Sequence, residues 1–292
     1  MRVFVTGATG GIGSVVVAEL IAEGHEVVGL ARSDTSAQAL TAAGASVLRG
    51  DLNNPEALRA GANQSDGVIH LAFGSPNDFP KAIAEETLAV EAFGTALEGS
   101  GKPFVIASGT PAVPGRAATE QDPWPTDGPL GGRGRNAQSV LGLAERGVRS
   151  AVVRLPRSVH AKGERCGFAS VLVDAARRSG VSGYVGDGTQ RWPAVHRLDA
   201  ARLFRLVLEQ ASPGTVAHAV ADEGDTMRSI ADVIGRQLDL PVGIIPAESF
   251  GFLGIVFGVD QPASSALTRE TFGWQPTHPS LLADLEAGNY PA

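Results

Sequence analysis

This chain of 292 residues has one cysteine, Cys166, so no intrachain disulfide can form and a reducing compartment fits. No apolar run approaches the ~20 residues that a membrane-spanning helix needs, and no cationic segment with an apolar core precedes the first predicted strand, as a signal peptide would require. The formal net charge of -7 argues against nucleic acid and anionic membranes as partners. We therefore expect a cytoplasmic protein that acts on a small molecule.

Signals for metal chemistry and for serine-hydrolase chemistry are also missing. Histidine, cysteine and carboxylate residues nowhere recur at metal-ligand spacing, and no Gly-x-Ser-x-Gly elbow occurs. We expect no metal site. The hydrophobic content of 43% is enough for a full α/β core with a smaller lobe beside it.

The strongest positive signal lies in the first thirteen residues, MRVFVTGATGGIG. Residues 2–5 are an apolar run typical of a buried strand, and residues 15–22 have the apolar pattern of a helix. Glycines between them let the chain turn sharply, let the backbone approach a pyrophosphate and let the helix pack closely. The N-terminus of that helix then faces the phosphates. The predicted cofactor contacts in this turn are Gly7, Thr9, Gly10, Gly11, Ile12 and Gly13.

The end of the second predicted strand, residues 26–30, decides which dinucleotide is preferred. An acidic residue there would bind the ribose hydroxyls of NAD, but the chain continues with Ala31, Arg32 and Ser33. A guanidinium and a hydroxyl suit a 2′-phosphate, so we favour NADP(H) over NAD(H). Two alternatives stay open: Arg32 as a solvated loop charge, and Asp34 as a ribose ligand.

The stretch TGATGGIG resembles the TGxxGxxG form of the short-chain dehydrogenase/reductase superfamily, and later stretches resemble its extended and atypical branch, the NAD-dependent epimerase/dehydratase-like proteins. The resemblance implies an α/β fold, a Rossmann doubly wound parallel sheet with a smaller C-terminal substrate lobe. It places the NADP(H)-binding core in residues 1–156, with parts of 190–220 returning to it, and the substrate lobe mainly in residues 157–292. It also allows a homodimer.

The same resemblance assigns roles to residues at the ends of later strands. Asp51 and Leu52 would contact the adenine, and Ala72 and Phe73 the ribose and pyrophosphate. Ser108 would bind a substrate carbonyl beside the cofactor, and Pro156 would flank the nicotinamide. Two structural alternatives apply: Asp51 as the cap of a helix beginning at Pro55, and His70 as a packed core histidine.

The catalytic pair of the superfamily, a tyrosine followed four residues later by a lysine, is absent. The only tyrosines are Tyr184 and Tyr290, and neither has a lysine four residues on. Counting back from a helix predicted over residues 140–146, the tyrosine belongs near Leu130 or Gly131 and the lysine near Gly134 or Arg135. Arg133 or Arg135 could serve as a fixed cation on the ribose, but arginine does not titrate and cannot supply the proton. Both could instead be solvated loop or helix-start residues.

Another acid, or water, would then be needed, and the candidates are Tyr184, His160 and His196. The pattern of Asp199 before residues 200–208 fits a helix cap. The apolar residues 250–257 are either the core of the small lobe or a pocket wall.

Together these patterns predict an NADP(H)-dependent oxidoreductase that acts on a carbonyl-type or imine-type carbon of a small, fairly apolar substrate. A non-catalytic NADP(H)-binding sensor or regulator is the alternative that the missing pair favours. A sugar-nucleotide epimerase or dehydratase is weaker, because its proton transfers depend on that pair.

Overall fold

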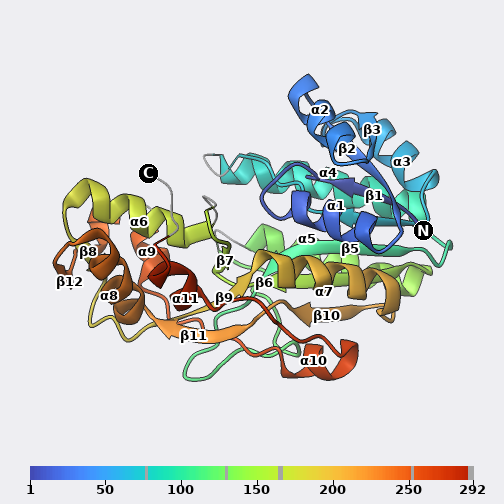
Figure 1. Cartoon of the computed structure of the whole chain (residues 1–292). Coiled ribbons are helices and arrows are strands. Elements are labelled where there is room, and N and C mark those ends of the chain that lie inside the picture. Colours follow the sequence, from blue (N-terminus) through green and yellow to red (C-terminus); the bar gives the residue numbers. More distant parts are fainter. Residues whose placement is uncertain (76–77, 129–130, 164–166, 251–252, 289–292) are drawn as a thin grey trace. The chain divides into compact units, whose positions relative to one another are not determined.

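The computed structural model describes residues 1–75, 78–128, 131–163, 167–250 and 253–288, which divide into two compact units (Figure 1). Unit 1 comprises residues 1–108, 124–154 and 201–217, and unit 2 comprises residues 109–123, 155–200 and 218–292. Each unit is described by itself.

A seven-stranded sheet with the order β10-β6-β5-β4-β1-β2-β3 forms the centre of unit 1. The order reverses between β1 and β4, and at such a switch point the carboxyl ends of parallel strands leave a crevice for ligands. Its strands are β1 (Arg2–Thr6), β2 (Glu26–Ala31), β3 (Ser46–Arg49), β4 (Gly67–His70), β5 (Pro103–Gly109), β6 (Arg149–Leu155) and β10 (Thr215–His218).

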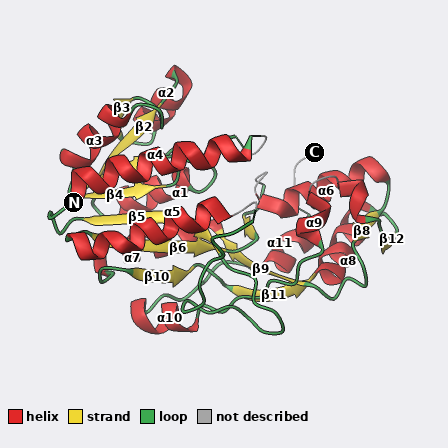
Figure 2. Ribbon diagram, turned by 180° about the vertical axis from the view of Figure 1, so that it is seen from behind, coloured by secondary structure: helices red, strands yellow, loops and turns green. Residues whose placement is uncertain are grey.

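Helices cover both faces of this sheet, which is the doubly wound arrangement (Figure 2). One face packs α3 (Pro55–Asn63), α4 (Phe79–Leu97) and α5 (Gly131–Gly142) against strand residues such as Phe4 and Phe104. Elsewhere in the unit, Arg205 of α7 (Arg197–Gln210) donates to Glu19 of α1 (Gly13–Ala22) at 2.8 Å. The remaining helices are α2 (Asp34–Ala42) and the short 3₁₀ helix Leu143–Arg146.

Unit 2 contains two small sheets, β11-β9-β7 and β12-β8, with helices around an aromatic core. Trp192 and Phe257 lie in that core with ring centroids 5.2 Å apart. The strands are β7 (Ser158–His160), β8 (Ser182–Tyr184), β9 (Arg191–His196), β11 (Asp222–Thr226) and β12 (Val242–Ile244). The helices are α6 (Gly167–Ser179), α8 (Met227–Leu238), the 3₁₀ helix Ala247–Phe250, α9 (Leu253–Phe257), α10 (Ala266–Phe272) and α11 (Leu281–Glu286).

The predicted fold class is confirmed, while several local predictions are wrong. The helix at Pro55 is capped by Asn54, whose side chain accepts from the Ala57 N–H, and not by Asp51, whose carboxylate accepts from the Asn53 N–H. Asp199 lies inside the first turn of α7 and accepts from residues 277 and 278 instead of capping the helix.

The segment before residue 140, where we left a solvated loop and a helix start open for Arg133 and Arg135, is helical from Gly131. Of residues 250–257, Phe257 is fully buried in the core of unit 2, and residues 251 and 252 lie outside the described part of the chain. None of the described helices is long and apolar enough to cross a membrane.

Candidate functional site

The glycine turn after β1 is shaped by two close backbone approaches. Gly7 has φ +68°, and a Cβ atom there would lie 2.6 Å from the backbone nitrogen of Ala72. A Cβ atom on Gly13 would lie 2.0 Å from the carbonyl oxygen of Gly7, so α1 can begin this close to the turn only with glycine. The Gly10 N–H donates to the same oxygen at 2.9 Å, and the neighbouring helix start keeps backbone N–H groups available for a phosphate.

A cavity of about 460 Å³ lies beside this turn, at the switch point of the sheet. It is large enough for part of a dinucleotide, and no Cβ of Gly7 or Gly10 narrows it. Predicted cofactor residues that line it are Gly7, Thr9, Gly10, Arg32, Asp51, Leu52, Ala72 and Phe73.

The other predicted cofactor residues fall outside this lining. Gly11, Ile12 and Gly13 lie in the same turn, and Ser33 caps α2 by accepting from the Ser36 N–H at 3.2 Å. Pro156 belongs to unit 2, while Ser108 and Arg133 belong to unit 1.

The end of β2 brings a cation and a nearby hydroxyl to the cavity. Arg32 lines the cavity and is exposed, and Ser36, which the sequence did not single out, lines it from the first turn of α2. Asp34 does not line it, because its carboxylate pairs with Arg49 of β3. A serine in the first turn of a helix belongs to no recognisable cofactor-binding motif, so only the fold shows that Ser36 lines the cavity.

Asn53, in the loop after β3, and Glu85, on α4, also line the cavity. The Asn53 side-chain amide donates to Glu85 at 3.3 Å. Neither residue belongs to a recognisable motif, and they are separated by 32 positions, so no sequence signal joins them.

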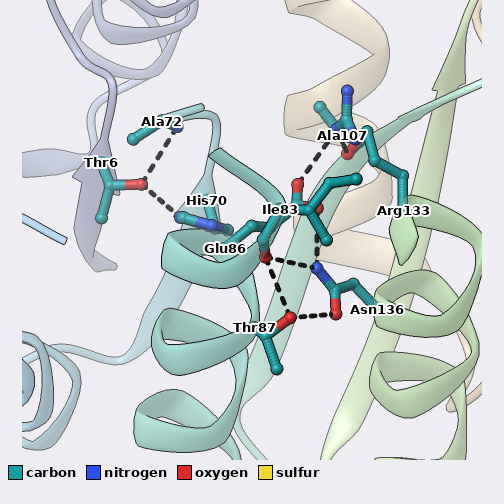
Figure 3. Close-up of polar contacts among 9 residues, drawn as sticks. All are labelled: Thr6, His70, Ala72, Ile83, Glu86, Thr87, Ala107, Arg133 and Asn136. Atoms are coloured by element: carbon teal, nitrogen blue, oxygen red, sulfur yellow. Dashed lines mark hydrogen bonds and ion pairs between the residues drawn. The ribbon is translucent and has the colours of Figure 1, made fainter. Parts of the chain in front are cut away.

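Arg133, predicted as a substitute for the missing lysine, is held by three contacts in unit 1, of which Figure 3 draws the two hydrogen-bonded ones. Its Nη2 donates to Glu86 at 3.1 Å and to the carbonyl of Ala107 at 2.9 Å. Its guanidinium lies 4.3 Å from the ring centroid of Phe73, a cation–π contact. The structure therefore brings Arg133 to the cavity residue Phe73 and to the residue preceding Ser108.

Glu86 is a buried carboxylate that fixes this arrangement, and no motif in the sequence pointed to it. Its second oxygen accepts from Asn136 at 2.9 Å, and the Asn136 side-chain oxygen accepts from Thr87 at 2.8 Å (Figure 3). A buried carboxylate is stable only when its oxygens are paired, and here α5 supplies both partners. Arg135, the other candidate cation, instead donates to the carbonyl of Thr126.

Two of the positions expected for the catalytic tyrosine and lysine, Gly131 and Gly134, have no room for a side chain. A Cβ atom on Gly131 would lie 2.2 Å from the carbonyl oxygen of Thr126, and one on Gly134 would lie 2.2 Å from that of Pro125. Leu130, the alternative tyrosine position, lies outside the described residues. The start of α5 is therefore built for close packing against residues 125–126.

Ser108 is 5% exposed, and its hydroxyl has no hydrogen-bond partner among the residues that the structure describes. It lies one residue before the end of β5, at the sheet edge where parallel strands present ligand-binding groups. A buried hydroxyl without a partner costs free energy, which a bound acceptor or donor would offset.

His70 is buried at the end of β4 and packs as a structural residue. Its Nδ1 lies 2.6 Å from the hydroxyl of Thr6, which also accepts from the Ala72 N–H at 3.3 Å (Figure 3). Burial, and secondarily the charge of Arg133, lower the pKa of His70 to about 3.

This depressed pKa predicts acid sensitivity. Below pH 6.5 the unfolded chain binds a proton at His70 while the folded chain does not until about pH 3, so stability present above pH 6.5 is lost as the pH falls. In that window we expect the titration of His70 to lower the free energy of unfolding by about 1.4 kcal/mol for each unit by which the pH falls. Urea unfolding between pH 7 and 4.5 checks this, with His70→Asn showing the shallower slope. Equal slopes in both proteins would contradict it.

The three candidate proton donors all lie in unit 2. The Tyr184 hydroxyl accepts from Arg228 Nη2 at 2.9 Å. His160 is fully buried, with Nδ1 2.7 Å from Asp284, and its ring lies 5.5 Å from that of His196. Tyr290 lies outside the described residues.

His196 is stacked on a further histidine, which the sequence did not single out. Its ring centroid lies 4.6 Å from that of His278, whose Nδ1 is 2.9 Å from Asp199. Burial, followed by the neighbouring His160 and His278, lowers the pKa of His196 to about 4. A neutral ring of this kind is a weak acid near pH 7, so His196 is no ready proton donor.

Comparisons with known proteins agree with this fold. Residues 3–221 match the profile of the NAD dependent epimerase/dehydratase family. The chain is 47% identical to an uncharacterized protein of Saccharomyces cerevisiae, with 99% of each chain covered, and 42% identical to one of Schizosaccharomyces pombe, covering 99% of this chain and all of the other. Its fold is similar to that of a dTDP-glucose 4,6-dehydratase double mutant of Streptomyces venezuelae with NAD and DAU bound, at 17% identity, a TM-score of 0.81 and coverage of 99% and 96%.

Proposed function

The chain belongs to the NAD dependent epimerase/dehydratase family, and on that premise we propose that it is an NADP(H)-dependent reductase of atypical type. Its substrate would be a small, fairly apolar molecule with a carbonyl-type or imine-type carbon. The observation that carries the proposal is the cavity at the switch point, lined by the glycine turn, Arg32 and Phe73.

Preference for NADP(H) rests on the charges at the end of β2. Arg32 and Ser36 line the cavity, and the carboxylate of Asp34, at the start of α2, is engaged by Arg49. A 2′-phosphate would therefore meet a guanidinium, a hydroxyl and the start of α2, while ribose hydroxyls would find no free carboxylate from Asp34.

The main role of the chain's own residues would be to orient the reactants, and not to exchange protons with them. A bound nicotinamide supplies or takes the hydride. The Ser108 hydroxyl would donate to a substrate oxygen or accept from a substrate nitrogen, and Arg133 would hold fixed positive charge at the end of β5. An iminium already carries its proton and a ketone can take one from water, so reduction tolerates the missing tyrosine.

Titration of NADPH and NADH, followed by a panel of carbonyl and imine substrates, tests the proposal. We expect tighter binding of NADPH than of NADH, and loss of absorbance at the nicotinamide band with at least one substrate. If neither dinucleotide binds, the assignment of the cavity is wrong.

Ser108→Ala provides the matching test of the reaction. We expect turnover to fall at least about tenfold, which is the loss of one hydrogen bond to the reacting group, while the Kd for NADPH stays unchanged. Ser100→Ala, which alters an exposed serine of the same unit, serves as the control. Unchanged turnover in Ser108→Ala would remove Ser108 from the site.

The start of α5 favours a second candidate function, a non-catalytic NADP(H) sensor. Gly131 and Gly134 pack where the catalytic tyrosine and lysine would stand, so the chain keeps the binding cavity without the proton-transfer pair. Tight NADPH binding without turnover on any substrate of the panel would favour the sensor over the reductase.

A further inference from the structure

Arg157 of unit 2, which follows β6 and precedes β7, is a largely desolvated cation with no carboxylate partner among the residues that the structure describes. Its Nε donates to the side-chain oxygen of Gln261, and neither Nη1 nor Nη2 has a hydrogen-bond acceptor among the residues that the structure describes. Burial lowers the pKa of its guanidinium to about 10, with no opposing charge acting on it. The group nevertheless stays charged at neutral pH.

Three other partly buried arginines are paired at their terminal nitrogens. Arg205 donates to Glu209 and Arg133 to Glu86, and Arg149 donates to the carbonyls of Glu209 and Ala211. A desolvated charge without such partners costs free energy, because the lost hydration is not replaced. Arg157 therefore differs from these arginines in having two donor nitrogens free.

The surroundings hold Arg157 in place without neutralising it. Gln261 is itself fixed, since its side-chain nitrogen donates to the carbonyl of Thr110 and its N–H donates to that of Arg191 at 2.9 Å. The guanidinium carbon lies 6.0 Å from the ring centroid of Phe168 and 5.8 Å from that of Trp192. These rings offer weak cation–π attraction, and Phe168, which is partly exposed while Trp192 is fully buried, offers an apolar wall.

A second polar group beside this wall also lacks a partner. The indole N–H of Trp192 is buried and has no hydrogen-bond acceptor among the described residues. Arg157 keeps partial exposure, so a small molecule can reach it. The free edge of a guanidinium matches the two oxygens of a carboxylate or phosphate, and neighbouring aromatic rings suit an apolar body.

We propose that Arg157 and the partly exposed ring of Phe168, which contacts the buried Trp192, form a receptor for an apolar molecule that carries an oxyanion, a carboxylate or a phosphate. The receptor lies wholly in unit 2, and its existence does not depend on hydride transfer. Its use as the anchor of the substrate rests on the proposed function.

Calorimetric titration of the full-length protein with phenylacetate, phenyl phosphate and neutral benzyl alcohol tests the receptor. We expect at least one anion to bind about tenfold or more tightly than benzyl alcohol, and the tighter anion identifies the group that the site accepts. Arg157→Met, which keeps the apolar stem on the rings, should weaken that anion about ten- to hundredfold. Arg157→Lys, which keeps the charge but cannot donate two parallel hydrogen bonds to an oxyanion, should lose part of the affinity.

Arg228→Met is the matched control, because Arg228 also lies over an aromatic ring of unit 2, 5.2 Å from the centroid of Tyr184, but is bonded to that residue's hydroxyl. It should bind the anion like the wild type. Thermal unfolding of each variant, with and without the anion, confirms that the proteins are folded and should show anion stabilisation only where Arg157 is present.

Two results would overturn the receptor: anions that bind no more tightly than benzyl alcohol, or equal anion affinity in wild type and Arg157→Met. A parallel NADPH titration keeps the two proposals apart. Intact NADPH binding without anion binding rejects the receptor alone, and anion binding without NADPH binding rejects the proposed function alone.

Discussion

Gly13→Ala is expected to abolish dinucleotide binding, because a Cβ atom there would lie 2.0 Å from the carbonyl oxygen of Gly7. Backbone at both ends of the turn would have to move, and the start of α1 would leave its place beside the cavity. Overpacking of this kind also costs about 1–3 kcal/mol of unfolding free energy. Calorimetric titration with NADPH and urea unfolding measure the two effects.

Gly11→Ala provides a control within the same turn. Gly11 is exposed, and a Cβ atom there meets no other atom within 4 Å. We expect stability to change little and NADPH binding to survive. If Gly13→Ala binds NADPH as tightly as Gly11→Ala does, the turn does not position the phosphates.

Arg32→Gln should raise the Kd for NADPH about ten- to hundredfold and leave the Kd for NADH nearly unchanged. The lost interaction is one charge-assisted hydrogen bond to the 2′-phosphate, which NADH lacks. High salt should reduce the NADPH preference of the wild type, since Arg32 is exposed.

Arg49→Gln is the companion variant, because Arg49 is an exposed arginine nearby that pairs with Asp34 and does not line the cavity. Its loss should leave the NADPH affinity close to that of the wild type. If Arg32→Gln weakens the binding of NADPH and NADH equally, Arg32 does not bind the 2′-phosphate.

The sequence by itself determined the features that rest on local pattern. The β1 run, the spacing of Gly7, Gly10 and Gly13 and the helix after them predict a dinucleotide fold, because each glycine serves a backbone approach within a few residues. The absence of the tyrosine–lysine pair was also readable directly, since the chain has two tyrosines in all.

Only the tertiary structure decided which side chains meet across the chain. Glu86 and Arg133 are 47 positions apart, and Arg157 and Gln261 are 104 apart, so no periodicity relates them. Local reasoning also misplaced Asp199, which resembles a helix cap but binds residues 277 and 278. A carboxylate at the start of a helix accepts from whichever unpaired N–H groups the fold brings to it. Here the backbone N–H groups of residues 277 and 278 are those groups.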